Sequence, residues 1–546
     1  MDVLGPTGIS WQSAAIAAAC ATAVLLVFTI LYRLWLHPLA AHPGPFLAKC
    51  TSWYAAYQSY TGNIHYDILR CHELYGDVVR YRPNGLLFNN VEGLEDIYRH
   101  PTKTKKARGY FFLRENGTVS ILSAIDKEEH APRRRLLSRG FSVAALQKYE
   151  TLISQTARVF CDTLLGNSSH NAKEGQWGPS LNVGDISSYF TFDVMSNLVF
   201  YCPQDLLTKP DGRGIVEDIE SSTFLGGIAI EQPALVGSLL LRKLLFPKHC
   251  NSVEELGRKA KGFAMKRAAH GKEHHVDDIF TALMGQGEKG PVLSMDELGA
   301  EGAVMIGAGM KRMRIHDAHM IRNTLIPAGT DTSSVAISSL FFYLSRHPAA
   351  YERLASEIRT IFRSAEEIAP GPKLTSCGYL RACIDESLRL APPIAAPLWR
   401  EMCRHGDAVA GIVLPKGTDV ATCIYSIQRN PAYFSDPNEF KPERWLSEYE
   451  NESWMQLAKK AFVPFSLGSR GCIGKNLAYQ EISTALAQII YRMDWKIADG
   501  PLGKIGETRP GKGGAVDFDI RGHYTSAKTG PFIQFMPRDS GNTKSS

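Results

Sequence analysis

Apolar positions recur with the spacing of an α-helix along most of this chain. The segments with this period are about 64–76, 126–165, 183–200, 252–270, 333–346, 349–364, 375–390 and 474–492. Strand-like runs are short, and the clearest pairs are 78–81 with 86–88, 412–414 with 419–422, and 518–520 with 532–535. The pattern therefore predicts a mainly α protein, with one large helical domain that carries small antiparallel β-sheets.

The N-terminus departs from this pattern. No charged residue occurs from Ala14 to Tyr32, which is close to the roughly 20 apolar residues that cross a bilayer as a helix. A cleaved signal peptide would have a shorter apolar region and a basic start, whereas Asp2 precedes this run and Arg33 follows it. Residues 1–36 are therefore predicted to be a single-pass transmembrane anchor. The positive-inside rule places the remaining chain in the cytosol.

Residues 37–50 contain Pro38, Pro43 and Pro45, which predict a stiff, extended link between the anchor and the rest of the protein. No Ser/Gly-rich linker, charge block or repeat divides residues 51–546. We therefore expect these residues to form one large domain.

Composition excludes several classes of protein. The 546 residues are 44% hydrophobic, which is ample for a large core. A net charge of +6 is small for this length and does not indicate a nucleic-acid partner. The 11 cysteines include no C-x-x-C pair, so neither a zinc site nor a disulfide scaffold is indicated.

Cys472 lies in the segment Phe465-Ser466-Leu467-Gly468-Ser469-Arg470-Gly471-Cys472-Ile473-Gly474, which precedes an amphipathic helix. Glycines on both sides allow the backbone to approach a cofactor closely. A helix N-terminus and the nearby Arg470 should lower the pKa of the thiol and favour a metal-binding thiolate. The alternatives are a buried structural cysteine and a P-loop. The P-loop is disfavoured because Ser469 replaces its first glycine and Asn476 its Ser/Thr.

The pattern F-x-x-G-x-R-x-C-x-G resembles the haem-binding signature of the cytochrome P450 family at every defined position. The resemblance implies the P450 fold and haem b, iron protoporphyrin IX, as the cofactor. Cys472 would be the axial thiolate ligand of the iron. Arg470 would pair with a haem propionate, and Phe465, Gly468 and Gly474 are the other cofactor-binding positions of the signature.

The stretch from Ala328 to Ser333 resembles the oxygen-activating part of the family's long central helix. There, Asp331 and Thr332 would relay protons to bound dioxygen. For this stretch alone, the alternative is hydroxyl groups that bond back to helix carbonyls.

Other arginines match the family too. Glu386 and Arg389, three residues apart, and Arg444 of Pro442-Glu443-Arg444-Trp445 would form a buried charge triad that locks the cysteine-bearing side of the core. His130 and Arg134 have the spacing of the family's W-x-x-x-R motif, with histidine in place of tryptophan, and Arg400 matches another propionate-pairing arginine.

Residues 310–329 interrupt the central helix that the resemblance implies. This stretch is polar and basic and includes Pro327, and a proline inside a helix costs about 3 kcal/mol or more. Removing it joins Gly309 to Thr330 in an unbroken helix. We therefore hypothesise that residues 310–329 come from a retained intron. The alternative is a genuine loop outside the core.

The resemblance covers nearly the whole chain and implies a fungal-type microsomal monooxygenase of secondary metabolite biosynthesis. It would insert one oxygen atom from O2 into a lipophilic small molecule at the endoplasmic reticulum membrane. NADPH would supply electrons through NADPH-cytochrome P450 reductase, with Arg133, Arg135 and Arg139 as candidate docking residues. The alternatives are a reductase-independent haem-thiolate isomerase or dehydratase, and an inactive haem-binding protein if the inserted segment is genuine.

By the same resemblance, the substrate pocket would draw on four stretches. Aromatic and aliphatic residues prevail in them, and core packing is the alternative for each one. The stretches are Tyr110–Leu113, Phe224–Ile230, Ile394–Leu398 and Tyr524–Thr525.

Overall fold

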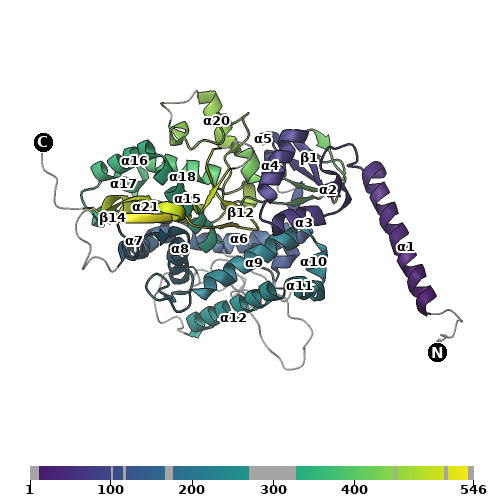
Figure 1. The fold of residues 1–546 in the computed structure, drawn as a ribbon, viewed down its shortest axis with the longest axis horizontal. Helices are drawn as coiled ribbons and strands as arrows, with labels where there is room; N and C mark the ends of the chain where they lie inside the picture. Colours follow the sequence, from purple (N-terminus) through teal and green to yellow (C-terminus); the bar gives the residue numbers. More distant parts are fainter. Residues whose placement is uncertain are drawn as a thin grey trace.

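The computed structural model describes residues 11–99, 103–114, 118–166, 176–269, 279, 328–446, 448, 452–509 and 515–538. Within these residues the chain is mainly α-helical with small β-sheets, which confirms the predicted fold class (Figure 1). Residues 310–327, most of the segment suspected to come from an intron, lie outside the described residues. The origin of that segment stays a hypothesis.

Helices make up most of the described chain. The α-helices are α1 (Trp11–Leu31), α2 (Phe46–Cys50), α3 (Trp53–Tyr60), α4 (Ile64–Tyr75), α5 (Val91–Tyr98), α6 (Lys127–Gly140), α7 (Val143–Leu165), α8 (Val183–Phe200), α9 (Gly214–Glu231), α10 (Ala234–Gly237), α11 (Leu239–Leu245), α12 (Pro247–Ala269), α15 (Thr330–Arg346), α16 (Pro348–Ile361), α17 (Pro372–Thr375), α18 (Gly378–Leu390), α19 (Ile424–Ile427), α20 (Glu452–Ala461) and α21 (Lys475–Arg492). Short 3-10 helices are η2 (Arg108–Leu113), η4 (Ala365–Glu367), η5 (Pro442–Trp445), η6 (Gly468–Arg470) and η7 (Gly500–Lys504).

The strands form one sheet in the order β1-β2-β8-β5-β3, one in the order β4-β14-β9, and three two-stranded sheets, β6-β7, β10-β11 and β12-β13. Their bounds are β1 (Val78–Arg82), β2 (Gly85–Phe88), β3 (Thr104–Lys106), β4 (Leu181–Asn182), β5 (Arg400–Met402), β6 (Ala408–Val409), β7 (Ile412–Val413), β8 (Asp419–Ala421), β9 (Met493–Ile497), β10 (Glu507–Thr508), β11 (Asp517–Phe518), β12 (Ile520–Gly522), β13 (Ser526–Lys528) and β14 (Phe532–Pro537). Figure 1 places the five-stranded sheet and α2–α5 on the side from which α1 projects, while α7, α8, α15, α16, α18 and α21 fill the opposite side.

Strand pairing was predicted only in part. The β1–β2 hairpin is confirmed. The pairing of 412–414 with 419–422 is wrong, because β7 pairs with β6 while β8 runs parallel to β2 and antiparallel to β5. The tail pairing is also wrong, since β14 pairs with β9 and β4, and β11 and β12 pair with β10 and β13. Pairings between strands far apart in sequence carry no local signal that a single sequence reveals.

Two helix predictions differ from the structure for local reasons. The segment 126–165 is two helices, because the Ser142 side chain accepts a hydrogen bond from Ala145 N at 3.3 Å and starts α7 anew. Helix α9 was not predicted. Its second half is buried on all sides and contains Gly226-Gly227, so only its first half has a polar face and its helix propensity is low.

Helix α1 and the π-helical turn Tyr32–Leu36 that follows it project from the domain (Figure 1). Among the described residues, Trp11–Leu36 is long and apolar enough to cross a membrane, with a mean hydropathy of 2.5 in its most apolar window. The link after it is not extended as expected. It contains α2 and packs on the sheet, where Arg80 N donates to Pro43 O at 2.7 Å and Leu39 is buried.

Candidate active site

A cavity of about 250 Å³ lies where α6, α8, the start of α15 and the loop before α21 meet. Its wall is mostly apolar, with contributions from Leu137, Met195, Ile394 and Leu477. Eight of the residues predicted from the sequence line it, namely His130, Arg134, Thr332, Arg400, Phe465, Arg470, Cys472 and Gly474. The structure therefore brings together residues that are more than 300 positions apart in the chain.

The loop before α21 is closed on itself by backbone hydrogen bonds. Cys472 N donates to Phe465 O at 2.8 Å, and Gly471 N donates to Gly468 O at 3.0 Å. Gly468 has a φ of +68° and packs so closely on Tyr98 that a Cβ would collide with the carbonyl oxygen of that residue. Gly468 does not line the cavity, and its left-handed conformation shapes the loop.

The Cys472 side chain is exposed, and the space it is exposed to is the cavity inside the protein. Burial raises the pKa of the thiol above its ordinary value, although the N–H groups of Gly474 and Lys475 and the Arg134 charge act in the opposite direction. The sequence predicted a lowered pKa. That prediction is wrong for the protein alone because burial outweighs the helix N-terminus and the cations.

One edge of the cavity is positively charged. Arg134 donates to Gly471 O at 2.6 Å, Arg400 to Trp399 O at 3.1 Å, and Arg470 to Ile125 O at 2.6 Å. Within the described part of the chain, no carboxylate lies at ion-pair distance from these three arginines. Burial and the Arg400 charge lower the pKa of Arg470 to about 10. Burial and the surrounding cations lower that of His130 to about 3, so this imidazole is neutral.

The two residues of the proposed proton relay separate in space. Thr332 lines the cavity, but its Oγ1 donates to Ala328 O at 2.6 Å, which is the back-bonding that the sequence alone allowed as the alternative. Asp331 is buried outside the cavity wall, and its carboxylate accepts a hydrogen bond from Thr525. Burial raises the pKa of Asp331, while Lys528 and Thr525 oppose that rise.

The triad predicted from the sequence is present as a buried network. Glu386 accepts from Arg389 Nη2 at 2.8 Å and from Arg444 Nε at 2.9 Å. Trp445 Nε1 and Lys441 N also donate to it, at 3.0 Å and 2.9 Å. Burial alone would raise the pKa of Glu386, but the two guanidinium groups outweigh burial and lower it.

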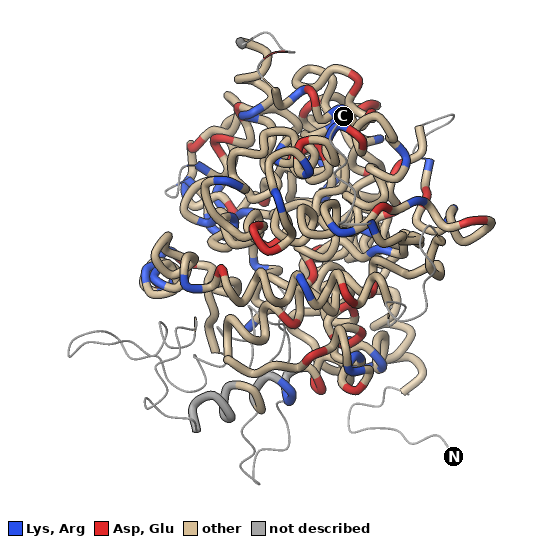
Figure 2. The backbone as a smooth tube through the Cα atoms, turned by 90° about the vertical axis from the view of Figure 1, so that its left-hand side faces the viewer, with Lys and Arg blue, Asp and Glu red and all other residues tan. Residues whose placement is uncertain are grey.

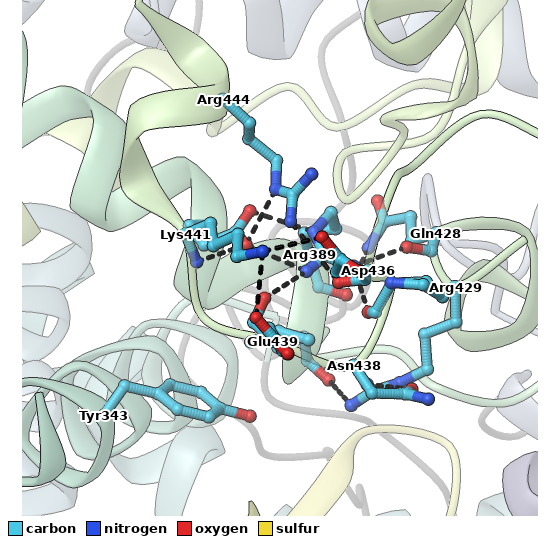
Figure 3. Close-up of polar contacts among 12 residues, drawn as sticks. Tyr343, Arg389, Gln428, Arg429, Asp436, Asn438, Glu439, Lys441 and Arg444 are labelled. Carbon is cyan, nitrogen blue, oxygen red and sulfur yellow. Dashed lines mark hydrogen bonds and ion pairs between the residues drawn. The ribbon is translucent and has the colours of Figure 1, made fainter. Parts of the chain in front are cut away.

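The arginines of the triad also bond to the loop between α19 and η5. Arg389 donates to the carbonyls of Gln428 and Glu439 at 2.9 Å and 3.0 Å, as Figure 3 shows. Arg444 donates to Ser435 O at 3.0 Å. The network therefore holds α18 to the loop after α19, and none of its members lines the cavity.

Several buried charged groups were not predicted from the sequence. Arg429 pairs with Asp517 at 2.5 Å, and Arg82 pairs with Glu231 at 2.5 Å. Glu481 of α21 lines the cavity, and burial raises the pKa of its carboxyl group to about 8. A glutamate within the apolar face of an amphipathic helix was the available signal for Glu481. The two ion pairs join distant segments and left no local signal.

The predicted substrate stretches line the cavity only in part. Tyr110, Ile394, Leu398, Tyr524 and Thr525 do so. Phe111 is instead 41% exposed, and Phe224 stacks on His249 with ring centroids 4.4 Å apart. The first of these faces solvent and the second belongs to a separate aromatic cluster.

Comparison with known proteins gives a consistent result. The family model described as Cytochrome P450 matches residues 43–508. Cytochrome P450 monooxygenase apf7 of Gibberella fujikuroi is 38% identical over 95% of this chain and 97% of its own length. Cytochrome P450 monooxygenase AKT7 of Alternaria alternata is 36% identical over 93% of this chain and 94% of its own, and atnE of Emericella nidulans is 36% identical over 94% and 95%. The chain therefore belongs to the cytochrome P450 family and is a P450 monooxygenase.

Proposed function

We propose that this enzyme binds haem b through Cys472 and inserts one oxygen atom from O2 into a lipophilic small molecule of fungal secondary metabolism. The observation that carries the proposal is the position of the Cys472 thiol. It opens on a cavity inside the protein that is also lined by Gly329, the residue before α15, and by Thr332 of α15. Curated relatives from three fungi support the monooxygenase class.

The residues around the cavity fit a porphyrin with two carboxylates. Glycine at 474 keeps the space beside the sulfur open, since a Cβ built there would lie 3.9 Å from Cys472 Sγ. The arginines at 134, 400 and 470 have no carboxylate partner among the described residues, and guanidinium groups match propionates in geometry and charge. Neutral His130 would add an uncharged hydrogen bond. When bound, the haem supplies activation of O2 with electrons from NADPH.

The pocket supports a lipophilic substrate with few polar groups. Apolar side chains such as Ile121, Leu122 and Ile394 line it, while Tyr110 and Tyr524 offer the only tyrosine hydroxyls in its described wall. Ligand pockets of this kind gain affinity from apolar burial and orientation from a few polar groups. Such a wall suits an oligocyclic or long-chain scaffold better than a charged metabolite.

Residues 1–36 would anchor the enzyme in the endoplasmic reticulum membrane, with residues 51–546 as the catalytic domain. The apolar helix Trp11–Leu36 supports this arrangement by its length and composition. NADPH-cytochrome P450 reductase would bind on the cytosolic side. Arg135 and Arg139 are exposed on α6 for that contact, whereas Arg133 is half-buried and donates to Val119 O at 3.0 Å. In Figure 2 basic and acidic residues are interspersed, so docking would depend on this local group.

The deciding experiment compares wild type with Cys472→Ala in the full chain, expressed with a fungal reductase. We expect the wild type to give the reduced carbon monoxide spectrum of a thiolate ligand, and the variant to lose it. Cys161→Ala serves as the control, because Cys161 is fully buried in α7 away from the cavity. Dealkylation of alkoxycoumarin probes to hydroxycoumarin and aldehyde, dependent on both NADPH and O2, would distinguish a monooxygenase from a reductase-independent isomerase or dehydratase. An unchanged axial ligand in Cys472→Ala would disprove the proposal.

A further inference from the structure

The tip of the β12–β13 hairpin, residues 523–525, forms part of the cavity wall. Backbone bonds fix the tip from two sides, because Tyr524 N donates to Thr223 O at 3.2 Å and Ser526 N donates to Pro393 O at 2.8 Å. The tip also presses on α9 at Gly227, where a Cβ would lie 2.8 Å from Tyr524 N. Thr525 is therefore held in one position by the backbone around it.

Thr525 connects the buried carboxylate of α15 with the cavity. Its Oγ1 donates to Oδ2 of Asp331 in a short contact. Asp331 is 5% exposed and does not line the cavity, whereas Thr525 does. The neighbouring hydroxyl of Thr332 is engaged with Ala328 O. Among the described contacts, the route from this carboxyl group to the cavity thus runs through Thr525.

The far side of Asp331 faces other ionisable groups. Lys528 of β13 donates to Ser334 Oγ at 2.8 Å and Ser188 Oγ at 3.0 Å, and its charge favours the Asp331 carboxylate. Glu220 of α9 is exposed and interacts with both Lys528 and Asp331. Asp185 of α8 is exposed and also interacts with Lys528. Ionisable groups therefore continue from Asp331 towards solvent.

We propose that Thr525 is a proton-relay residue, whose hydroxyl passes protons from the Asp331 carboxyl group into the cavity during oxygen activation. This inference rests on the proposed monooxygenase function. When Asp331 is protonated, its carboxyl group donates to the Thr525 oxygen, and the Thr525 hydroxyl, which donates to the ionised Asp331, turns towards the cavity. The Thr525 oxygen then takes the Asp331 proton as it releases its own hydroxyl proton to the oxygen species being reduced in the cavity. The carboxylate that remains is stabilised by Lys528 and takes its next proton from the solvent side, where Glu220 and Asp185 lie.

The test compares Thr525→Val, which keeps the shape of the side chain without the hydroxyl, with Thr525→Ser, which keeps the hydroxyl. With an alkoxycoumarin probe, the valine variant should keep the carbon monoxide spectrum and oxidise NADPH. Product formed per NADPH should fall about tenfold or more, with peroxide released instead, because positioned proton donors contribute roughly 10²–10⁴-fold. The solvent isotope effect should rise in the valine variant and return to the wild-type value in the serine variant. Ser526→Ala is the control, since its hydroxyl donates to Pro392 O at 2.9 Å.

A second readout does not depend on turnover. Infrared difference spectra of the carbon monoxide complex should show the protonated Asp331 band at higher pH in Thr525→Val than in wild type, because the lost hydrogen bond stabilised the carboxylate. Asp331→Asn should remove the band. If Thr525→Val loses the carbon monoxide spectrum, Thr525→Ala replaces it in the comparison with serine. Wild-type coupling and isotope effect in the variant without the hydroxyl would overturn the relay. Absence of product from the wild type with intact haem would instead count against the monooxygenase proposal.

Discussion

Two groups of interior arginines differ in what compensates their charge. In the triad, Arg389 and Arg444 share the carboxylate of Glu386, and all three side chains are at most 2% exposed. The remaining N–H groups of the two arginines point at backbone carbonyls. The protein thus supplies both the counter-charge and the hydrogen bonds of this group from its own residues.

The arginines of the cavity edge lack such a counter-charge. Arg134, Arg400 and Arg470 bond to backbone carbonyls, and no carboxylate in the described residues pairs with them. Repulsion between Arg400 and Arg470 adds to the cost of burial. Uncompensated interior charge is expensive. The charges of the triad are therefore balanced within the folded protein, whereas the cavity edge has the charge that the proposed binding of an anionic group requires.

Removing the carboxylate of the triad should have the largest effect on the stability of the protein. Glu386→Gln leaves two buried guanidinium groups without a counter-charge, which costs about 3–5 kcal/mol. We expect loss of soluble, haem-loaded protein, measured as yield and as the urea midpoint of tryptophan fluorescence. Glu367→Gln is the control, because its partner Lys373 is 48% exposed and such pairs contribute about 0–1 kcal/mol. Equal stability of the two variants would refute the assignment of Glu386 as a structural counter-ion.

The opposite outcome is expected at the cavity edge. Arg400→Met removes a buried cation that has no carboxylate partner, so the stability of the haem-free protein should stay equal or rise. Haem should dissociate about tenfold faster or more, because a hydrogen bond to a charged group contributes about 1.5–3 kcal/mol. The measurement is the rate of haem transfer to a scavenging protein, together with the urea midpoint. A variant that unfolds like Glu386→Gln would remove the distinction between the two groups.

The residues of both arginine groups could be predicted from the sequence where they belong to a local motif. The signature around Cys472 and the pair at Glu386 and Arg389 have fixed spacing, and a helix sets which side chains share a face. The helices with a clear apolar stripe were found for the same reason. Arg444 could be added only through the family resemblance, because no local pattern joins it to α18.

The features that could not be predicted from the sequence depend on contacts between distant segments. Thr525 meets Asp331 across 194 positions, and Arg429 meets Asp517 across 88. The second half of α9, which contains two glycines, is buried on all sides and lacks the polar face on which helix prediction rests. The direction of the Cys472 pKa shift was also hidden, since it depends on how much protein surrounds the sulfur rather than on the helix that follows.

The smallest expected effect concerns His65, which lies beside the buried ion pair of Arg429 and Asp517. The measurement asks whether the surroundings of this ion pair carry excess negative charge. His65 is fully buried beside Arg429, and neither of its ring nitrogens has a hydrogen-bond partner among the residues that the structure describes. Burial, with the Arg429 and His523 charges, lowers the pKa of His65 to about 3. A spare carboxylate nearby would raise that pKa instead.

Between pH 7 and 5.5 the unfolded chain therefore takes up a proton at His65 that the folded protein does not, so stability falls as the pH is lowered. The loss from this residue should be about 1 kcal/mol, since unfolded histidine titrates near 6.5. His65→Leu should lose less stability than wild type by that amount, as measured by urea unfolding at both pH values, while the exposed His405→Leu should not. An identical loss in wild type and His65→Leu would mean that His65 gains a proton in the folded protein. The Arg429–Asp517 network would then carry unbalanced negative charge.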